Sequence, residues 1–352
     1  MKTDLNDRAE AIQQDPAQLE EGVPMDGADG GVNAPKQHQT GLIRDLIKPA
    51  FEIIRKRAEP AGQQEIMWPT WASELRNIYG NGLRPGLHVL VGNTGSGKTQ
   101  LAVQFARDAV AAGHHTLFLA LEADAGGTDV VARLVSLDPE IRKQGLHWAD
   151  LMRGRYRHGG EWMLLEPDRI DAAQQAAERM KDLPITISRP PEATADGIAS
   201  SIREWAGTGY AGPARLVVVD YLQMVRGTLL NRREAIGVLS GKLRRLAADH
   251  GLVILCISST AREKYEQLTE GKADSTKKTQ SAPKLGTGDP EWLVGMGKET
   301  GEIEYDSDSV MVLCRNKDEG TTWVAVAKQR IGERSWAKVP FVRGFWGSER
   351  IS

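Results

Sequence analysis

The chain lacks the features that mark secreted, membrane-spanning and disulfide-linked proteins. It has two cysteines in 352 residues, Cys256 and Cys314, and both lie in apolar runs that predict buried strands. We therefore expect inert core thiols in a reducing compartment. No run approaches the roughly 20 apolar residues that a membrane span needs, and the start, Met-Lys-Thr-Asp-Leu-Asn-Asp, is unlike a secretory signal. These absences predict a cytoplasmic protein with no membrane partner.

An excess of charge of one sign is also absent. The chain has 45 Lys and Arg against 47 Asp and Glu, a formal net charge of −2. There is thus no general basic field to attract nucleic acid. Any nucleic-acid site must be a local patch or a pore.

One complete motif is present. Residues 92–99 read Gly-Asn-Thr-Gly-Ser-Gly-Lys-Thr, the G-x-x-x-x-G-K-[ST] pattern of a phosphate-binding loop, or P-loop. Its glycines let backbone N–H groups surround a polyphosphate at a helix N-terminus. An apolar strand pattern over 87–91 precedes the loop, and a helical pattern over 100–112 follows it. This context favours an ATP site over a chance glycine-rich turn, and the site consists of Gly92, Asn93, Thr94, Gly95, Ser96, Gly97, Lys98 and Thr99. Lys98 would reach the β and γ oxygens, and Thr99 would ligate Mg²⁺.

The N-terminal region divides into a tail and a helix. Residues 1–40 are polar and acidic without apolar periodicity, which predicts a disordered tail. Over 41–60 apolar residues recur at helical spacing, which predicts a helix that Pro49 kinks or restarts. Spacing alone leaves open whether this helix packs on its own domain or on a neighbouring subunit.

Residues 61–352 predict one α/β domain. Helices fill most of the early gaps between strands, as in a mainly parallel sheet, and the last two strands suggest a C-terminal β-hairpin. Residues 262–290 are polar and predict a long mobile loop, either functional or an unstructured insertion. Strands are expected near 87–91, 116–121, 184–188, 215–220, 252–257, 309–314, 322–328 and 337–342.

Two of these apolar strands end in an acid. Asp220 follows 216–219 and would hold the Mg²⁺ shell through water; otherwise it only caps the strand. Glu122 follows 117–121 and would orient and deprotonate the attacking water; otherwise it is a solvated carboxylate. Neighbouring parallel strands end at the same edge of a sheet, so the two acids should lie near the P-loop.

Two cations follow the strand over 323–327. Lys328 and Arg330 occupy alternate positions and should point the same way. They could reach the phosphates held by a neighbouring subunit as a trans-acting finger. Pattern alone favours a solvated hairpin edge.

Asp220-Tyr221-Leu222-Gln223 is more specific than an acidic strand end. It resembles the Asp-Tyr-Leu-Gln segment of DnaB-type replicative helicases, which are hexamers with RecA-like ATPase cores. Residues 41–347 resemble that family in order. The matching segments are 46–59 (linker helix), 82–86 (approach to the P-loop), 231–234 (after Asp-Tyr-Leu-Gln), 297–308 (Arg-Glu-Ser-Gly…Ile-Glu-Gln-Asp-Ala-Asp) and 328–332 (Lys-Gln-Arg-Asn-Gly).

The resemblance implies a role for each matched residue. Glu122 would be the catalytic glutamate and Asp220 the Mg²⁺-shell aspartate. Arg330, with Lys328, would reach the γ-phosphate held by the adjacent subunit. The linker helix would pack on that subunit and help to close the ring.

A further implied site binds DNA. Lys298, Glu299 and Gly301 would lie on a pore loop that touches the phosphates of single-stranded DNA. Lys298 stands where the family has arginine, so the charge is kept and the guanidinium fork is lost.

Two departures from the family stand out. Ser259 replaces a glutamine that senses the γ-phosphate, and its shorter side chain is expected to weaken the coupling of hydrolysis to loop movement. The family's globular N-terminal domain, which forms a collar and aids primase contact, has no counterpart in the polar tail.

The resemblance thus implies an ATP-dependent, hexameric DNA helicase that moves 5′→3′ on single-stranded DNA during replication, with a loader or primase as possible partners. The alternative is a RecA-family ATPase resembling RadA or KaiC that binds DNA or partners without unwinding. A third hypothesis is a nucleotide-gated binding protein.

Overall fold

The computed structural model describes residues 43–58, 65–122, 127–208, 214–227, 231–260, 285–297, 301–316, 321–342 and 344–347. The predicted acidic tail, residues 262–284 of the predicted loop, Lys298 and Glu299 lie outside these ranges. The chain divides into two compact units, Met1–Ile53 and Ile54–Ser352, and each is described by itself. None of the helices in these ranges has both the length and the apolar character of a membrane span.

Helix α1 spans Ile43–Ala58 without interruption, so of the two outcomes predicted at Pro49, a kink or a restart, the restart as a second helix does not occur. A proline removes one backbone hydrogen bond, and a helix can continue through that loss. Four apolar side chains of α1, spaced by three or four residues, share one face. These side chains are between 51% and 81% exposed: Ile43, Ile47, Phe51 and Ile54.

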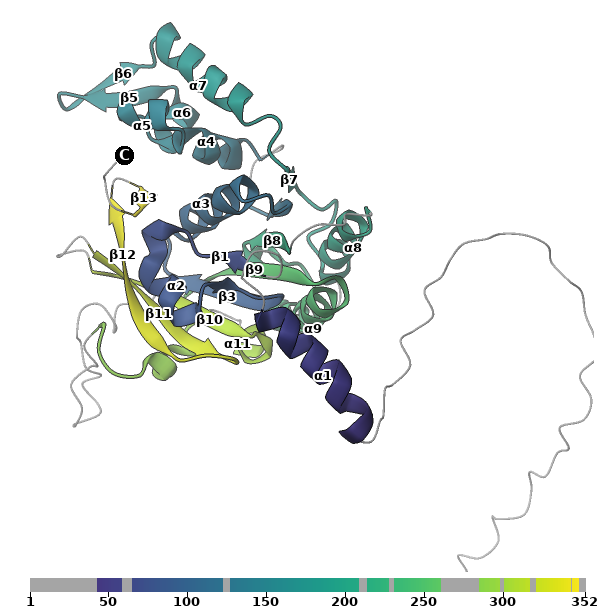
Figure 1. The fold of residues 1–352 in the computed structure, drawn as a ribbon. Helices are drawn as coiled ribbons and strands as arrows, with labels where there is room; N and C mark the ends of the chain where they lie inside the picture. Colours follow the sequence, from purple (N-terminus) through teal and green to yellow (C-terminus); the bar gives the residue numbers. More distant parts are fainter. Residues whose placement is uncertain are drawn as a thin grey trace, which may run out of the picture. The chain divides into compact units, whose positions relative to one another are not determined.

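A nine-stranded sheet forms the centre of the second unit (Figure 1). Its order is β13-β12-β11-β10-β3-β9-β8-β4-β7, and the strands from β10 to β7 run parallel. The predicted α/β fold with a mainly parallel sheet and a C-terminal hairpin is confirmed. The strands are β3 (Gly86–Gly92), β4 (Thr116–Ala120), β7 (Ile185–Ser188), β8 (Arg215–Asp220), β9 (Leu252–Ser259), β10 (Ser309–Asn316), β11 (Thr321–Gln329), β12 (Ser335–Val342) and β13 (Phe345–Trp346).

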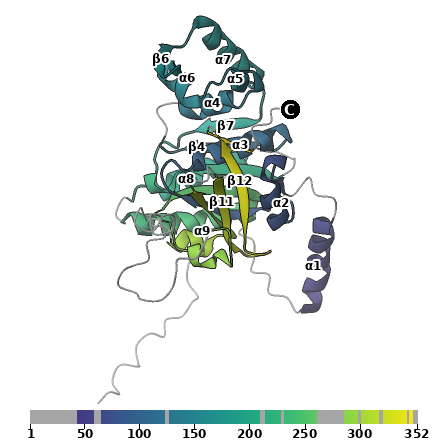
Figure 2. The ribbon, with the colours of Figure 1, turned by 90° about the vertical axis from the view of Figure 1, so that its left-hand side faces the viewer.

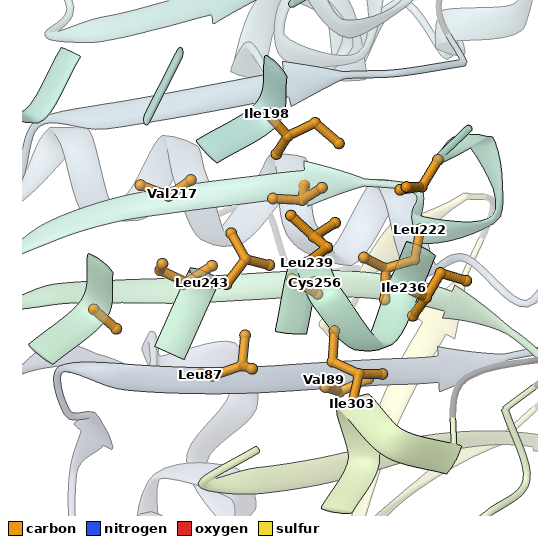
Figure 3. Close-up of a cluster of buried hydrophobic side chains, with 14 of the residues drawn as sticks. Leu87, Val89, Ile198, Val217, Leu222, Ile236, Leu239, Leu243, Cys256 and Ile303 are labelled. Carbon is orange, nitrogen blue, oxygen red and sulfur yellow. The ribbon is translucent and has the colours of Figure 1, made fainter. Parts of the chain in front are cut away.

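The two faces of this sheet pack into two apolar clusters, because successive strand residues point to opposite faces. On β3, Leu90 belongs to one cluster and Val89 to the other. Helices α2 (Ser73–Tyr79) and α3 (Lys98–Ala111) cover the first face, and α8 (Ala195–Ala206) and α9 (Arg232–His250) cover the second. Figure 3 shows Leu239 and Leu243 of α9 facing the strands of the second cluster. Both cysteines are buried there, as predicted.

A small subdomain connects β4 to β7 at one end of the sheet (Figures 1 and 2). It contains α4 (Thr128–Ser136), α5 (Pro139–Lys143), α6 (Trp148–Arg153), the hairpin β5 (Arg155–His158) and β6 (Glu161–Leu164), and α7 (Pro167–Arg179). Its own core holds Val135, Ile141, Leu146, Leu165 and Ala176. The hairpin was not expected, because its strands are mostly exposed and have no buried alternation.

Short elements complete the described chain. They are β1 (Ile66–Met67) paired with β2 (Gly82–Leu83), the 3₁₀ turns η1 (Thr70–Ala72), η2 (Leu222–Met224) and η3 (Pro290–Leu293), and α11 (Gly301–Asp306). The family-like segment 231–234 begins α9 with a capping box. The Asn231 side chain accepts from the Glu234 N–H at 3.0 Å, and the Glu234 carboxylate accepts from the Asn231 N–H at 3.2 Å.

Candidate functional site: a P-loop at the carboxyl edge of the sheet

The parallel strands bring most of the predicted ATP-site residues to one edge of the sheet. Strand β3 ends at Gly92, which pairs with Ser259 at the end of β9. Strand β8 ends at Asp220, which pairs with Ala120 at the end of β4, two residues before Glu122. Carboxyl ends of parallel strands are where open α/β sheets bind ligands.

The P-loop connects β3 to the N-terminus of α3. Gly95 and Gly97 adopt φ values of 76° and 92°, which favour glycine. A Cβ at Gly92 would lie 2.7 Å from the Ser96 Oγ, so a larger residue here would displace the Ser96 side chain. The Lys98 ammonium donates to the carbonyls of Gly92 and Asn93, each at 2.8 Å. The lysine therefore lies across the loop where phosphate oxygens would replace those carbonyls.

Asp220 and Thr99 meet beside this lysine. Asp220 is buried, and its carboxylate accepts a hydrogen bond from the Thr99 hydroxyl. Burial raises the pKa of Asp220 to about 6, although the Thr99 bond and the charges of Arg133 and Lys98 oppose the rise. Burial likewise lowers the pKa of Lys98 to about 8, against the pull of Asp220 and Glu122.

This donor set fits Mg²⁺ bound together with a nucleotide. Mg²⁺ prefers oxygen ligands and is held by one or two protein groups plus phosphates and waters. The Thr99 hydroxyl and Asp220 carboxylate supply two such oxygens. Within the described ranges no group of three or more His, Cys, Asp or Glu could hold a metal without help from a nucleotide.

A cavity of about 520 Å³ adjoins the P-loop, a size typical of small-molecule sites. Six of its side chains were not foreseen from the sequence, because no motif includes them: Gln100, Arg133, His147, Trp148, Arg315 and Phe341. The full lining is Gly95, Gly97, Lys98, Thr99, Gln100, Arg133, His147, Trp148, Arg315, Phe341 and Gly344.

Arg133 of α4 adds a second cationic side chain, besides Lys98, to the phosphate region. Its guanidinium lies 3.5 Å from the centre of the Trp148 ring and donates to the Gln100 Oε1 at 3.3 Å. Burial lowers the pKa of Arg133, and Asp129, Asp220 and Glu122 oppose this shift. An arginine that lines the same cavity as Lys98 and interacts electrostatically with Asp220 is well placed to contact a phosphate oxygen.

The C-terminal strands supply another part of the cavity lining. A Cβ at Gly97 would lie 2.8 Å from the Phe341 ring, so the ring rests directly on the P-loop. The Arg315 guanidinium lies 5.6 Å from the centre of that ring, and the Trp346 indole donates to the Gly97 carbonyl at 3.1 Å. An aromatic ring beside a phosphate loop offers a stacking surface for a nucleobase.

The sensor position also lies at this edge. The Ser259 N–H donates to the Gln223 Oε1 at 3.2 Å, and the Gln223 amide donates to the Ser258 Oγ at 3.1 Å. The glutamine of Asp-Tyr-Leu-Gln thus holds the end of β9 next to Asp220.

Arg330 and Lys328 lie at the other edge of the sheet. Strand β11 runs antiparallel to β10, so Gln329 pairs with Ser309 at the start of β10. The Arg330 N–H donates to the Asp308 carbonyl, and the Asp308 N–H donates to the Leu87 carbonyl near the start of β3. At about 3.3 Å per residue, Leu87 is roughly 17 Å from Gly92, so Arg330 cannot contact a γ-phosphate bound to its own chain.

Both Arg330 and Lys328 have polar partners within the same chain. The Arg330 guanidinium lies 3.4 Å from the Asp308 carboxylate. The Lys328 ammonium donates to the carbonyls of Glu304, at 2.9 Å, and Tyr305 at the end of α11. Gly301, predicted to contact DNA, is exposed at the start of α11.

This fold and this site together define a RecA-like P-loop ATPase domain. The chain belongs to the family of DnaB-like helicase C-terminal domains, whose sequence model matches residues 69–346. The resemblance found in the sequence is thereby confirmed.

Individual relatives are distant but similar over long stretches. A probable plasmid replicative DNA helicase of Chlamydia trachomatis serovar L2 is 24% identical over 285 residues, 80% of this chain and 54% of that protein. The replicative DNA helicase DnaB of Treponema pallidum (strain Nichols) is 25% identical over 317 residues, 89% of this chain and 62% of that protein. The chain therefore spans little more than half the length of these relatives.

Two solved structures share the fold. One is described as an ATPase domain and is similar with a TM-score of 0.64 at 18% identity, over 89% of this chain and 100% of that one. A DnaB-like replicative helicase, described with its interactions with primase, gives a TM-score of 0.62 at 18% identity, over 89% of this chain and 68% of that one.

The raised pKa of Asp220 predicts pH-dependent nucleotide binding. Only the ionised carboxylate can hold the Mg²⁺ shell, so protons compete with the metal below about pH 6. The Mg²⁺-dependent affinity for a fluorescent ATP analogue should fall by up to tenfold for each pH unit below that value. Asp220→Asn is the control, since this variant removes only the Asp220 carboxyl. Any pH dependence that comes from His147, which lines the cavity, or from ATP itself is kept. A pH dependence equal in both proteins would contradict the assignment.

The stacking surface predicts a second effect on binding. Phe341→Ala should weaken ATP binding by about 1–3 kcal/mol, the usual value of one base–aromatic contact. Binding of inorganic triphosphate should change by less than twofold, because it has no base. An equal loss for both ligands, measured by competition against a fluorescent nucleotide, would show that the ring only supports the P-loop.

Proposed function

We propose that the protein is an ATP-driven helicase motor that forms a hexameric ring and moves 5′→3′ along single-stranded DNA during replication. The observation that carries this proposal is the position of Arg330, at the sheet edge opposite its own P-loop. A finger in that place can complete a nucleotide site only on another subunit. The family of the chain supports the same assembly.

The residues at the carboxyl edge take separate roles in hydrolysis. Lys98 binds the β and γ oxygens, and Thr99 and Asp220 hold Mg²⁺, which neutralises charge on the phosphates. Glu122 orients the attacking water and accepts its proton as the bond between the β and γ phosphates breaks. Arg330 of the neighbouring subunit stabilises charge on the transferred phosphoryl group, an effect worth roughly 10³–10⁵ in rate.

DNA would be gripped within the ring by Lys298, Glu299 and Gly301. A chain with net charge −2 can bind DNA in this way, because a ring concentrates one short cationic segment per subunit around a single strand. Lys298 supplies a point charge in place of an arginine fork, so the contact is to phosphate and not to bases. A loader or a primase would be a further partner.

A surface suited to ring closure lies on the subdomain. An apolar groove between α4, α6 and α7 leaves Val131, Met152 and Ile170 partly exposed. Such a groove fits the apolar face of an amphipathic helix. The exposed face of α1 from a second copy of this chain has that character.

Mixed rings test the shared site. Arg330→Ala and Glu122→Gln should each abolish DNA-stimulated ATP hydrolysis, since each removes one half of every site. A mixture of the two variants should regain part of the rate, because some interfaces then combine an intact Glu122 with an intact Arg330. Lys98→Ala, which removes the phosphate contact, should show no stimulated hydrolysis. A mixture that stays inactive while forming rings would contradict the shared site.

A forked-DNA assay separates the motor from its rival. A RecA-like ATPase that binds DNA without unwinding is favoured by one observation, the short Ser259 at the sensor position. Strand separation that depends on a free 5′ tail supports the helicase. DNA-stimulated hydrolysis without strand separation supports the rival.

The groove predicts that α1 controls assembly. Ile47→Asp should dissociate the ring, because burying an isoleucine contributes about 1.5–3 kcal/mol per interface and a buried aspartate adds a desolvation penalty. Glu52→Ala, on the opposite face of α1, should leave the assembly unchanged. Sedimentation at fixed protein concentration measures both, and an intact Ile47→Asp ring would exclude this docking mode.

A further inference from the structure

Among the residues that the structure describes, the most deeply buried acid outside the ATP site is Glu304 of α11. Its side chain is 0% exposed, and burying a carboxylate is costly unless it is well bonded. The carboxylate accepts from the Gly297 N–H at 2.8 Å and from the Gly295 N–H. Glu304 therefore connects α11, which follows residues 298–300 in the chain, to the backbone that precedes them. Residues 298–300 include Lys298 and Glu299 of the predicted DNA contact.

The tied segment leads back to the nucleotide edge. Gly297 forms an antiparallel bridge with Thr260. The Thr260 N–H donates to the carbonyl of Gly92, the first residue of the P-loop, at 3.1 Å. Thr260 also follows Ser259 directly in the chain. Glu304 is therefore connected through Gly297 and Thr260 to both the P-loop and the sensor position.

The other end of α11 leads to the finger. The Lys328 ammonium donates to the carbonyls of Glu304 and Tyr305, a favourable place for a cation at a helix C-terminus. Arg330 lies two residues further along, where it is bonded to Asp308 through both its backbone and its guanidinium. The Asp308 carboxylate also accepts from the Leu87 N–H at 2.9 Å, which anchors this end to β3.

We propose that Glu304 and Lys328 are positioning residues that couple the nucleotide edge of a subunit to the Arg330 finger of the same subunit. Because that finger serves the next site in the ring, the path would carry information from one ATP site to its neighbour. The inference rests on the proposed shared site. Short helix α11 is the rigid connector, since Glu304 is bonded at its carboxylate toward the P-loop and at its carbonyl toward the finger.

The alternative is that both side chains only stabilise the fold. A structural role would change the melting temperature and the affinity for nucleotide. A coupling role would instead change how sites act on each other, which appears in the Hill coefficient for ATP and in the factor by which DNA stimulates hydrolysis. The two roles therefore predict different measurements.

The test uses the full chain and the variants Glu304→Gln, Lys328→Met and their double mutant. Glutamine keeps the size of the glutamate but can accept only with its carbonyl oxygen. We expect each single variant to reduce DNA stimulation about tenfold or more, within the range usual for coupled sites, and to lower the Hill coefficient toward 1. The double mutant should be no worse than the worse single, because both residues lie on one path.

Controls separate the coupling from other effects. Lys242→Met is the matched control for the loss of a lysine. The Lys242 ammonium pairs with the Asp196 carboxylate at 2.9 Å, between α9 and α8. This variant should leave stimulation unchanged. If Glu304→Gln does not fold, Lys328→Met and its conservative partner Lys328→Arg carry the test, and arginine should restore most of the stimulation. Stimulation within twofold of the parent in the folded variants, or losses that multiply in the double mutant, would overturn the inference.

The inference and the proposed function fail in distinguishable ways. If the parent protein shows no DNA stimulation, or if Arg330→Ala retains it, the shared site is wrong and the coupling falls with it. If the parent is stimulated and Arg330→Ala is inactive, but Glu304→Gln behaves as the parent, only the coupling is wrong.

Discussion

The direction of the strands is the constraint on which the rest of this structure depends. Strands β3, β4, β8 and β9 run parallel, so they deliver the P-loop, Glu122, Asp220 and Ser259 to one edge of the sheet. Strand β11 runs the other way and carries Arg330 to the opposite edge. Under the proposed function, a single chain therefore presents most of one nucleotide site and the finger for another.

The polar groups around α11 follow from the same arrangement. In the proposed shared site the two edges lie a strand length apart, and the hydrogen bonds between neighbouring strands give no specific connection between them. In the proposed coupling, the connection consists of a buried carboxylate and a capping lysine, both with defined partners. Networks of this kind are rigid when fully bonded, because an unpaired buried charge is costly.

Much of this was predictable from the sequence, for physical reasons. Apolar runs mark the buried parallel strands, since both faces of such a strand are covered. The P-loop and the two strand-ending acids were located because their chemistry demands particular residue types at fixed spacing. The position of Arg330 at the edge opposite the P-loop was not predicted from its strand. Alternation along a strand gives the face of the sheet to which a residue points, and not the edge at which the strand ends.

Other features were beyond sequence reasoning. Arg133, Trp148, Arg315 and Phe341 line the cavity from elements far apart in the chain, so only the tertiary fold brings them together. The exposed hairpin β5–β6 has no alternation to reveal it. Lys328 was expected to reach outward with Arg330 as part of the finger, yet its ammonium contacts α11 carbonyls that no pattern in the strand indicates.

Crosslinking tests the central claim, that one nucleotide site is shared by two subunits, most directly. Thr94 of the P-loop and Ile331 beside the finger are both exposed, and the two native cysteines are buried. A chain with Thr94→Cys and Ile331→Cys would be treated with a short bifunctional thiol reagent in the presence of a non-hydrolysable ATP analogue. A shared site in a six-membered ring should give a ladder of covalent oligomers that ends at six chains. Monomeric products only, with or without an internal link, would contradict it.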